Sequence, residues 1–377
     1  MSEYQYYEFQ AIDRPLGEAE REALRALSSR ARITATSFTN HYEWGDFKGD
    51  PKKLMDRYFD LHLYLANWGA RRLMIRVPKR LVDASRLDSF LRDMEWVEVS
   101  ERGDNLIFDI CRDEVEPDTY DWDDGSGWLA ALAPLRTDVL SGDLRLFYLL
   151  WLAAIEEEGI DDDTIEPLSG VGPLTGALEA FAEFFAVDPD LVAAAAEQTC
   201  DAGSGGISRD AARDALVAMP EREKTELLLR LVEGDPHVAA ELKGRVRTFS
   251  AQPSAGLRTA GDLRARAAAI REERERMEAE KLEAERRRKA KEAEKAQRVR
   301  LEAVKRRGTV IWSDIEAEIE RRNAPGYETA AGLLFDLKVL ATDQGTLTDF
   351  ARRLEAIRER HARKGKFIER LKGLTAH

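Results

Sequence analysis

The feature that most limits how this chain can fold is a stretch of about 50 residues near its C-terminal end, dominated by charged side chains. From Asp262 to Arg307 the sequence contains neither proline nor glycine. Thr259 and Asp262 form a Thr/Asp variant of the capping box, which marks a helix start. We therefore predict one continuous helix over Arg258–Arg307, which at 1.5 Å per residue spans about 75 Å.

Pairs of opposite charge four residues apart follow one another along this stretch, among them Glu283–Arg287 and Glu285–Lys289. Each such pair stabilises an isolated helix by about 0.2–0.5 kcal/mol. The heptad positions that start at Ile270 place a lysine at residue 291, where a coiled coil needs an apolar core residue. A coiled-coil seam would therefore end after a few repeats. The pattern predicts an extended charged spacer, with a homodimer seam through the long helix as the alternative.

Charge is spread unevenly over the 377 residues, whose net charge is −13. Between Arg258 and the C-terminus there are 30 basic and 22 acidic residues, so the rest of the chain is more acidic than the total suggests. The acidic part of the chain before Arg258 repels the phosphate groups of nucleic acid, which argues against a protein that wraps nucleic acid.

Cysteine usage and hydropathy predict a cytoplasmic protein without a membrane segment. The two cysteines, Cys111 and Cys200, stand in no motif, which favours a reducing compartment. The N-terminus lacks the basic and apolar regions of a signal peptide. The longest apolar run, Leu146–Ile155, is too short to span a bilayer.

The N-terminal third predicts an α+β domain over residues 1–118. Expected strands are 4–12, 32–38, 61–65, 73–77, 96–99 and 106–111. Asp50 and Pro51 start a helix, and the bend at residues 67–69 predicts a hairpin. The side chains of His62, Tyr64, Arg72 and Arg76 share one sheet face, which indicates either an interaction patch or the solvated face of an antiparallel sheet.

After an acidic boundary loop at residues 113–127, the pattern is helical throughout. We predict an all-α helical domain over 119–250 with a flexible link at 202–206, the long charged helix over 258–307, and a domain of helical hairpins over 308–377. These hairpins resemble a tetratricopeptide-like helical repeat in architecture. In the helix opened by Pro220, the apolar residues of 227–232 are too dense for a surface helix, so we expect them to be buried.

Several segments carry a resemblance to known proteins. The stretch YYEFQAIDRP, residues 6–15, and the stretch from Trp44 to Pro78 resemble the N-terminus of an uncharacterised bacterial protein family, and DPDLVAAAAE and LLLRLVEGDPHVAAEL resemble its helical middle. The endings YETAAGLLFDLKVLATDQG and RHARKGKFIERL are similar to a helical tail of some bacterial SWIM zinc-finger proteins. The SWIM cysteines and histidine are absent, so the resemblance implies a shared tail or a role beside such proteins, and no reaction.

One cluster of residues is a candidate metal site. His41, Glu43, Asp46 and Asp50 surround the predicted turn between a strand and a helix. Histidine nitrogens and carboxylate oxygens are ligands of divalent cations. The alternative is a polar loop with a helix cap, and no cofactor is expected. His237 and Glu241 lie four apart, which predicts a helix-surface contact, because a metalloprotease motif needs a second histidine.

Two basic clusters are candidate nucleic-acid contacts. They are Arg286, Arg287, Arg288 and Lys289, and Lys305, Arg306 and Arg307. Such clusters make salt-sensitive contacts with phosphates. The long helix carries no aromatic side chain for base stacking, and its interleaved glutamates favour a solvated helix.

No nucleophile elbow or P-loop is present, so no reaction can be assigned. We predict a protein–protein interaction or scaffold protein that uses the long helix as a spacer and has other proteins as partners. The alternatives are an accessory subunit of a nucleic-acid-processing or phage-defence complex, and an enzyme of unrecognised type.

Overall fold

The computed structural model describes residues 3–92, 94–113, 115, 124–156, 159–198, 208–250 and 257–374. The chain divides into two compact units, residues 1–274 and 275–377. The predicted fold class is confirmed, because an antiparallel sheet is followed by helices that include the long one. No helix in the described part of the chain is long and apolar enough to cross a lipid bilayer.

The first unit contains a seven-stranded sheet in the order β2-β3-β1-β4-β5-β7-β6, with every neighbouring pair antiparallel. Its strands are β1 (Gln5–Gln10), β2 (Arg32–Ile33), β3 (Ser37–Tyr42), β4 (Leu61–Ala66), β5 (Arg71–Pro78), β6 (Val97–Arg102) and β7 (Asn105–Arg112). The predicted hairpin at residues 67–69 is confirmed. The predicted strand over 32–38 is instead two strands, because Thr34 and Ser37 bond to each other and close a turn.

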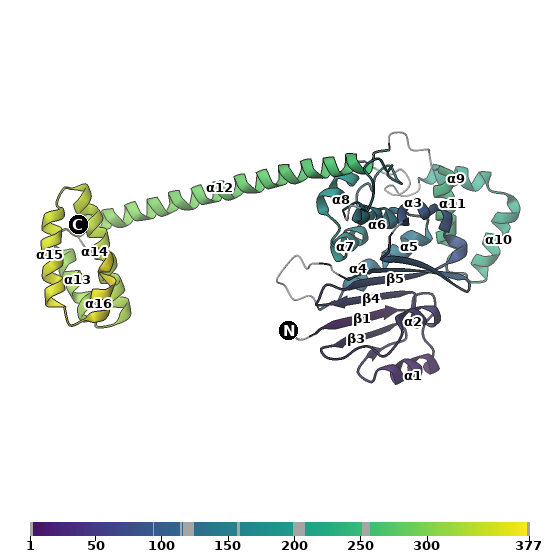
Figure 1. Ribbon diagram of the computed structural model, residues 1–377, viewed down its shortest axis with the longest axis horizontal. Coiled ribbons are helices and arrows are strands. Elements are labelled where there is room, and N and C mark those ends of the chain that lie inside the picture. Colours follow the sequence, from purple (N-terminus) through teal and green to yellow (C-terminus); the bar gives the residue numbers. More distant parts are fainter. Residues whose placement is uncertain are drawn as a thin grey trace. The chain divides into compact units, whose positions relative to one another are not determined.

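Helices complete the first unit. They are α1 (Glu18–Leu27), α2 (Pro51–Arg57), α3 (Asp88–Leu91), α4 (Trp128–Leu132), α5 (Pro134–Leu140), α6 (Arg145–Glu156), α7 (Gly176–Phe184), α8 (Pro189–Ala196), α9 (Arg209–Ala218), α10 (Glu221–Val232), α11 (Val238–Ser250) and the start of α12 (Ala260–Arg307), with short 3₁₀ turns at Lys79–Leu81 and Ala84–Arg86. Helices α4 to α7 gather on one side of the sheet (Figure 1).

The sheet and the helices after it share one core. Leu63, Ile75 and Phe108 project from one sheet face into the cluster that contains nearly all of α6, including Phe147. Alternation of side chains along each strand places these residues on the same face. The predicted division at residues 118 and 119 therefore falls inside the first unit. Residues 116–123 of the boundary loop and the predicted flexible link at 202–206 lie outside the described residues.

The opposite sheet face is also covered, so the interpretation of it as a solvated face or an interaction patch is wrong. Side chains from α1 and α2 pack there on Phe9 and Met74. The charged residues of this face are paired: Arg72 donates two bonds of 2.6 Å to Asp109, and Arg76 donates to Asp60 at 2.8 Å. These pairs allow charged side chains to be covered without leaving a buried charge uncompensated.

His62 is fully buried in this second core. Its ring stacks on Phe9 with 3.9 Å between centroids, and its Nδ1 lies 3.0 Å from the carbonyl oxygen of Glu8. Its Nε2 has no hydrogen-bond partner among the described residues. Burial lowers the pKa of His62 to about 3, so the imidazole is neutral in the folded protein at physiological pH.

The second unit holds the rest of α12, α13 (Val310–Glu320), α14 (Ala324–Asp343), α15 (Leu347–Arg360), α16 (Gly365–Arg370) and a 3₁₀ turn at Lys372–Leu374. Ile311, Ile315, Leu334 and Phe367 form its core. The predicted long helix is confirmed over Ala260–Arg307, with the Thr259–Asp262 capping bonds in place.

Only the two ends of α12 are covered. Ala260, Leu263 and Ala267 join the core of the first unit, and Val304 joins that of the second. Every residue from 271 to 300 is exposed. A helix without a covered apolar face depends on its propensity and its charge pairs, such as Arg287–Glu283 at 2.5 Å and Lys289–Glu285 at 2.8 Å.

The buried His62 predicts a pH dependence of stability. The folded pKa lies below the unfolded value near 6.5, so the unfolded chain binds the proton first and stability falls as the pH drops from about 6.5 towards 3. We expect His62→Phe to remove a loss of about 2 kcal/mol between pH 6.5 and 5.0. Urea unfolding followed by tryptophan fluorescence measures this, since six of the seven tryptophans precede residue 275. The same pH dependence in both proteins would contradict a buried neutral imidazole.

Candidate protein-docking groove

Three helices near the end of the first unit form an apolar groove. Helix α9 starts at a Ser208 cap, whose hydroxyl accepts a bond from the amide of Ala211 at 3.0 Å, and Pro220 opens α10. Gly234, with a φ of +86°, makes the turn into α11. Helices α9 and α10 each pack against α11, which therefore forms the floor between them.

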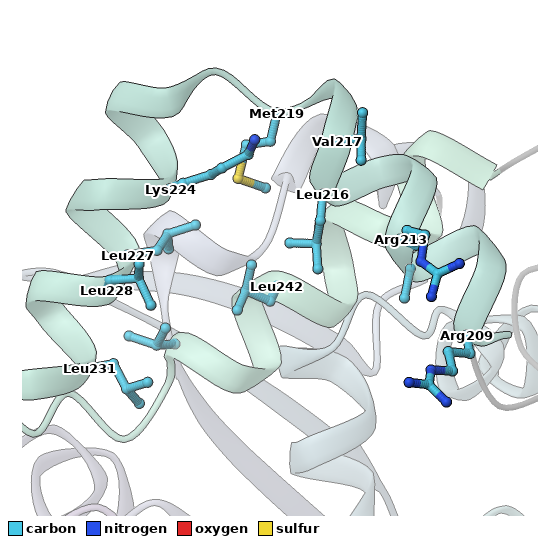
Figure 2. A pocket seen from close by; sticks show the side chains of 12 residues that line it. Arg209, Arg213, Leu216, Val217, Met219, Lys224, Leu227, Leu228, Leu231 and Leu242 are labelled. Carbon is cyan, nitrogen blue, oxygen red and sulfur yellow. The ribbon is translucent and has the colours of Figure 1, made fainter.

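The groove has a volume of about 650 Å³. Its walls and floor are shown in Figure 2. It is lined by Arg209, Ala212, Arg213, Leu216, Val217, Met219, Lys224, Leu227, Leu228, Leu231, Val238 and Leu242. This volume lies within the range of ligand-binding clefts in proteins.

The wall of α10 is an apolar stripe that the other described residues cover only in part. Leu227, Leu228 and Leu231 follow Lys224 at the spacing of one helix face. Leu227 is buried, whereas Leu228 and Leu231 are 62% and 55% exposed. The expectation that the apolar residues of 227–232 are buried is therefore wrong for all of them except Leu227.

Charged contacts join α10 to α11 on the face that also carries the buried Leu227. Glu223 of α10 pairs with Arg245 of α11 at 2.5 Å, and Arg230 of α10 pairs with Glu241 of α11 at 2.8 Å. Arg245 also pairs with Glu241, at 2.9 Å. These pairs hold this face of α10 against the floor helix, so Leu228 and Leu231 border the groove.

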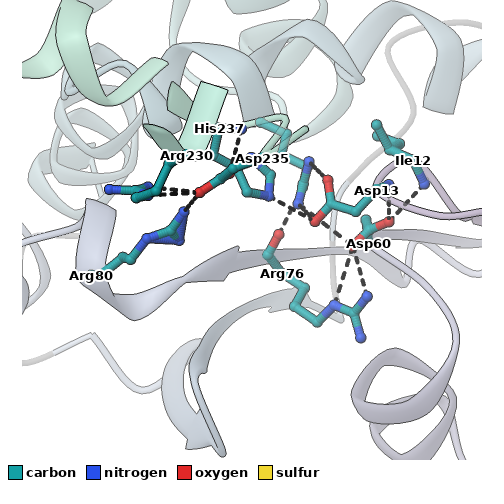
Figure 3. A network of polar contacts seen from close by, with 9 residues as sticks. Ile12, Asp13, Asp60, Arg76, Arg80, Arg230, Asp235 and His237 are labelled. Atoms are coloured by element: carbon teal, nitrogen blue, oxygen red, sulfur yellow. Dashed lines mark hydrogen bonds and ion pairs between the residues drawn. The ribbon is translucent and has the colours of Figure 1, made fainter. Parts of the chain in front are cut away.

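A second polar network fixes this helix pair to the rest of the first unit (Figure 3). Asp235, in the turn between α10 and α11, accepts bonds from Arg230 at 2.7 Å and Arg80 at 2.8 Å. Two residues later, the Nε2 of His237 lies 3.2 Å from a carboxylate oxygen of Asp13. The predicted surface contact between His237 and Glu241 is therefore wrong, because His237 is buried against the segment that follows β1.

Asp13 is the meeting point of this network. Arg136 of α5 donates two bonds to its carboxylate, at 2.9 and 2.7 Å, and one bond to the carbonyl oxygen of Arg76. Burial opposes ionisation of Asp13, but the hydrogen bonds from His237 and Arg136 outweigh it and hold the pKa of this carboxyl well below its usual value. Asp60 lies 3.5 Å from Arg136 and accepts bonds from the amides of residues 12 and 13.

Three of the four predicted metal residues make other contacts. Asp50 caps α2 by accepting bonds from the amides of Lys52 and Lys53, and Asp46 accepts a bond from the side chain of Gln5 at 2.9 Å. His41 is exposed and stacks on Tyr4, and Glu43 lies in the loop after β3. Among the described residues, no group of three or more histidine, cysteine or carboxylate side chains is placed to hold a metal ion.

The predicted nucleic-acid residues lie on α12, where acidic residues accompany them. Arg287, Arg288 and Lys289 each have a glutamate partner four residues away, and Arg307 lies 3.6 Å from Asp314. Arg286, Lys305 and Arg306 are exposed on the same helix. The interaction of these residues with nucleic acid stays a prediction.

Comparison with family models, with curated proteins and with solved structures found no match for this chain. The family resemblance and the SWIM-like tail therefore stay predictions. The groove residues were not predicted as a site from the sequence. A signal was present, because Arg209, Ala212, Arg213 and Leu216 of α9 repeat the spacing of the α10 stripe.

The network at Asp13 gives a stability prediction. We expect Arg136→Met to lower the free energy of unfolding by about 3 kcal/mol, because it removes both arginine bonds from the carboxylate of Asp13 and one of the two cations beside the buried Asp60. The control Arg14→Met breaks the exposed pair with Glu20 and costs about 1 kcal/mol or less. Urea unfolding compares the two, and equal losses would contradict the role of the network.

Proposed function

We propose that this is a protein–protein interaction protein whose first unit binds a segment of a partner in the groove between α9, α10 and α11. The observation that carries the proposal is the leucine stripe of α10, because Leu228 and Leu231 are exposed and line a groove. Contiguous exposed apolar surface beside polar residues is typical of interaction sites.

The size of the groove favours a peptide segment over a whole domain. Twelve residues line it, whereas a standard interface uses about 20–30 residues on each side. Peptide recognition of this kind draws its energy from a few apolar anchors that enter a groove. Fully burying one leucine side chain contributes about 1.5–3 kcal/mol. Burial of Leu228 and Leu231 would therefore supply a substantial part of the binding free energy of a weakly bound peptide.

The exposed part of α12 acts in this proposal as a spacer that joins the groove-bearing unit to the second unit. Its large apolar residues, Met277, Leu282 and Val299, do not repeat at heptad spacing, which favours a spacer over a dimer seam. A cytoplasmic location is part of the proposal, and the free Cys111 is consistent with a reducing compartment.

A selection experiment tests the docking function without any assumption about charge. Random 16-residue peptides displayed on phage are selected on the full-length protein. We expect enriched peptides with apolar residues at helical spacing, and at least tenfold weaker binding to Leu228→Asp. The matched control is Leu229→Asp on the same helix, since Leu229 is 53% exposed but does not line the groove. Peptides that bind Leu228→Asp and the original protein equally would contradict the proposal.

A further inference from the structure

The walls of the groove indicate the conformation of what binds there. Arg209, Ala212, Arg213 and Leu216 of α9 face it at positions i, i+3, i+4 and i+7, and Lys224 to Leu231 repeat the spacing on α10. Both walls consist of helix side chains, whose backbone groups are already paired within the helix. An extended segment would find no strand edge here to pair with its own amides and carbonyls. An α-helix satisfies its backbone internally and presents an apolar stripe to both walls.

The charged residues that line the groove are all basic. They are Arg209, Arg213 and Lys224, and none of the described residues that line it is acidic. This differs from the whole chain, in which acidic residues outnumber basic ones by 71 to 58. The charge of the lining is therefore opposite in sign to the net charge of the chain.

Arg209 and Arg213 are exposed and lie one helical turn apart on α9 (Figure 2). Neither forms an ion pair with any described residue, whereas Lys224 pairs with Glu221 at 2.8 Å. Two unpaired guanidinium groups beside an apolar surface attract carboxylates, and arginine binds carboxylates in a two-pronged geometry.

We propose that the groove binds an amphipathic α-helix of another protein that carries acidic residues four positions apart beside its apolar stripe. The acidic pair lies along Arg209 and Arg213, and the apolar residues enter between Leu216 and Leu228. This inference rests on the proposed docking function and specifies the partner of the same groove. Opposite charges at the edge of such a groove select the partner and set its direction, while the leucines supply most of the affinity.

Two synthetic 18-residue helical peptides labelled with fluorescein test this proposal on the full-length protein. Both have leucines at i, i+3, i+4 and i+7. The first peptide carries two glutamates four residues apart beside this stripe, and the second carries lysines there. Fluorescence anisotropy in 50 mM NaCl is expected to show at least tenfold tighter binding of the glutamate peptide, with the difference reduced in 500 mM NaCl because salt screens exposed charges.

Charge reversal supplies the decisive variant. We expect Arg209→Glu with Arg213→Glu to reverse the preference in favour of the lysine peptide. The control Arg222→Glu changes an exposed arginine of α10 that does not line the groove, and it should leave the preference unchanged. Because these arginines are exposed, the variants should keep the circular dichroism and melting temperature of the original protein.

The remaining outcomes separate the two proposals. Equal binding of both peptides that is lost in Leu228→Asp would overturn the acidic partner and leave the docking function standing. Binding of neither peptide, or binding that Leu228→Asp does not weaken, would overturn both. Light scattering of the protein alone should show a monomer; a dimer that dissociates in Leu228→Asp would assign the groove to a second copy of this chain and overturn the proposed partner.

Discussion

The set of ion pairs between α10 and α11 is the interaction on which the candidate site depends. Glu223, Arg230, Glu241 and Arg245 join these helices through their charged faces. An amphipathic helix usually turns its apolar face to its neighbour. Here Glu223 and Arg230, which lie on the same face as the buried Leu227, make the contact, so Leu228 and Leu231 remain free to form a wall. Among the described residues, the groove is therefore a consequence of how this helix is rotated.

The turn between α10 and α11 contacts the sheet-bearing part of the first unit. Asp235 joins the turn before α11 to Arg80, and His237 joins it to Asp13, which also binds Arg136. The two sheet faces in turn are both covered, one by the large helical core and the other by the smaller core around His62. The groove thus lies on helices that are anchored to a packed body, as a pre-formed binding surface requires.

Local patterns predicted much of the fold, because they depend on neighbours in sequence. Alternation in β4 and β5 indicated the hairpin, and the capping residues Thr259 and Asp262 indicated the start of α12. The pairing of Arg72 with Asp109, 37 residues away, could not be predicted by the same means, so a covered sheet face was interpreted as exposed. The prediction that the leucines of α10 are buried was wrong for a different reason. The density of apolar residues indicates that they need a partner, but it does not indicate whether that partner is part of the same chain.

The most direct test of this account is to ask what lies against α10 in the cell. A photoreactive amino acid replaces Leu228 in the groove wall, or Arg222 on another face of the same helix, in the full-length protein expressed in its source organism. The account predicts that irradiation joins position 228, but not position 222, to a helical segment of a different protein with acidic residues beside its apolar face. Equal capture at both positions, or capture of only a second copy of this chain, would contradict it.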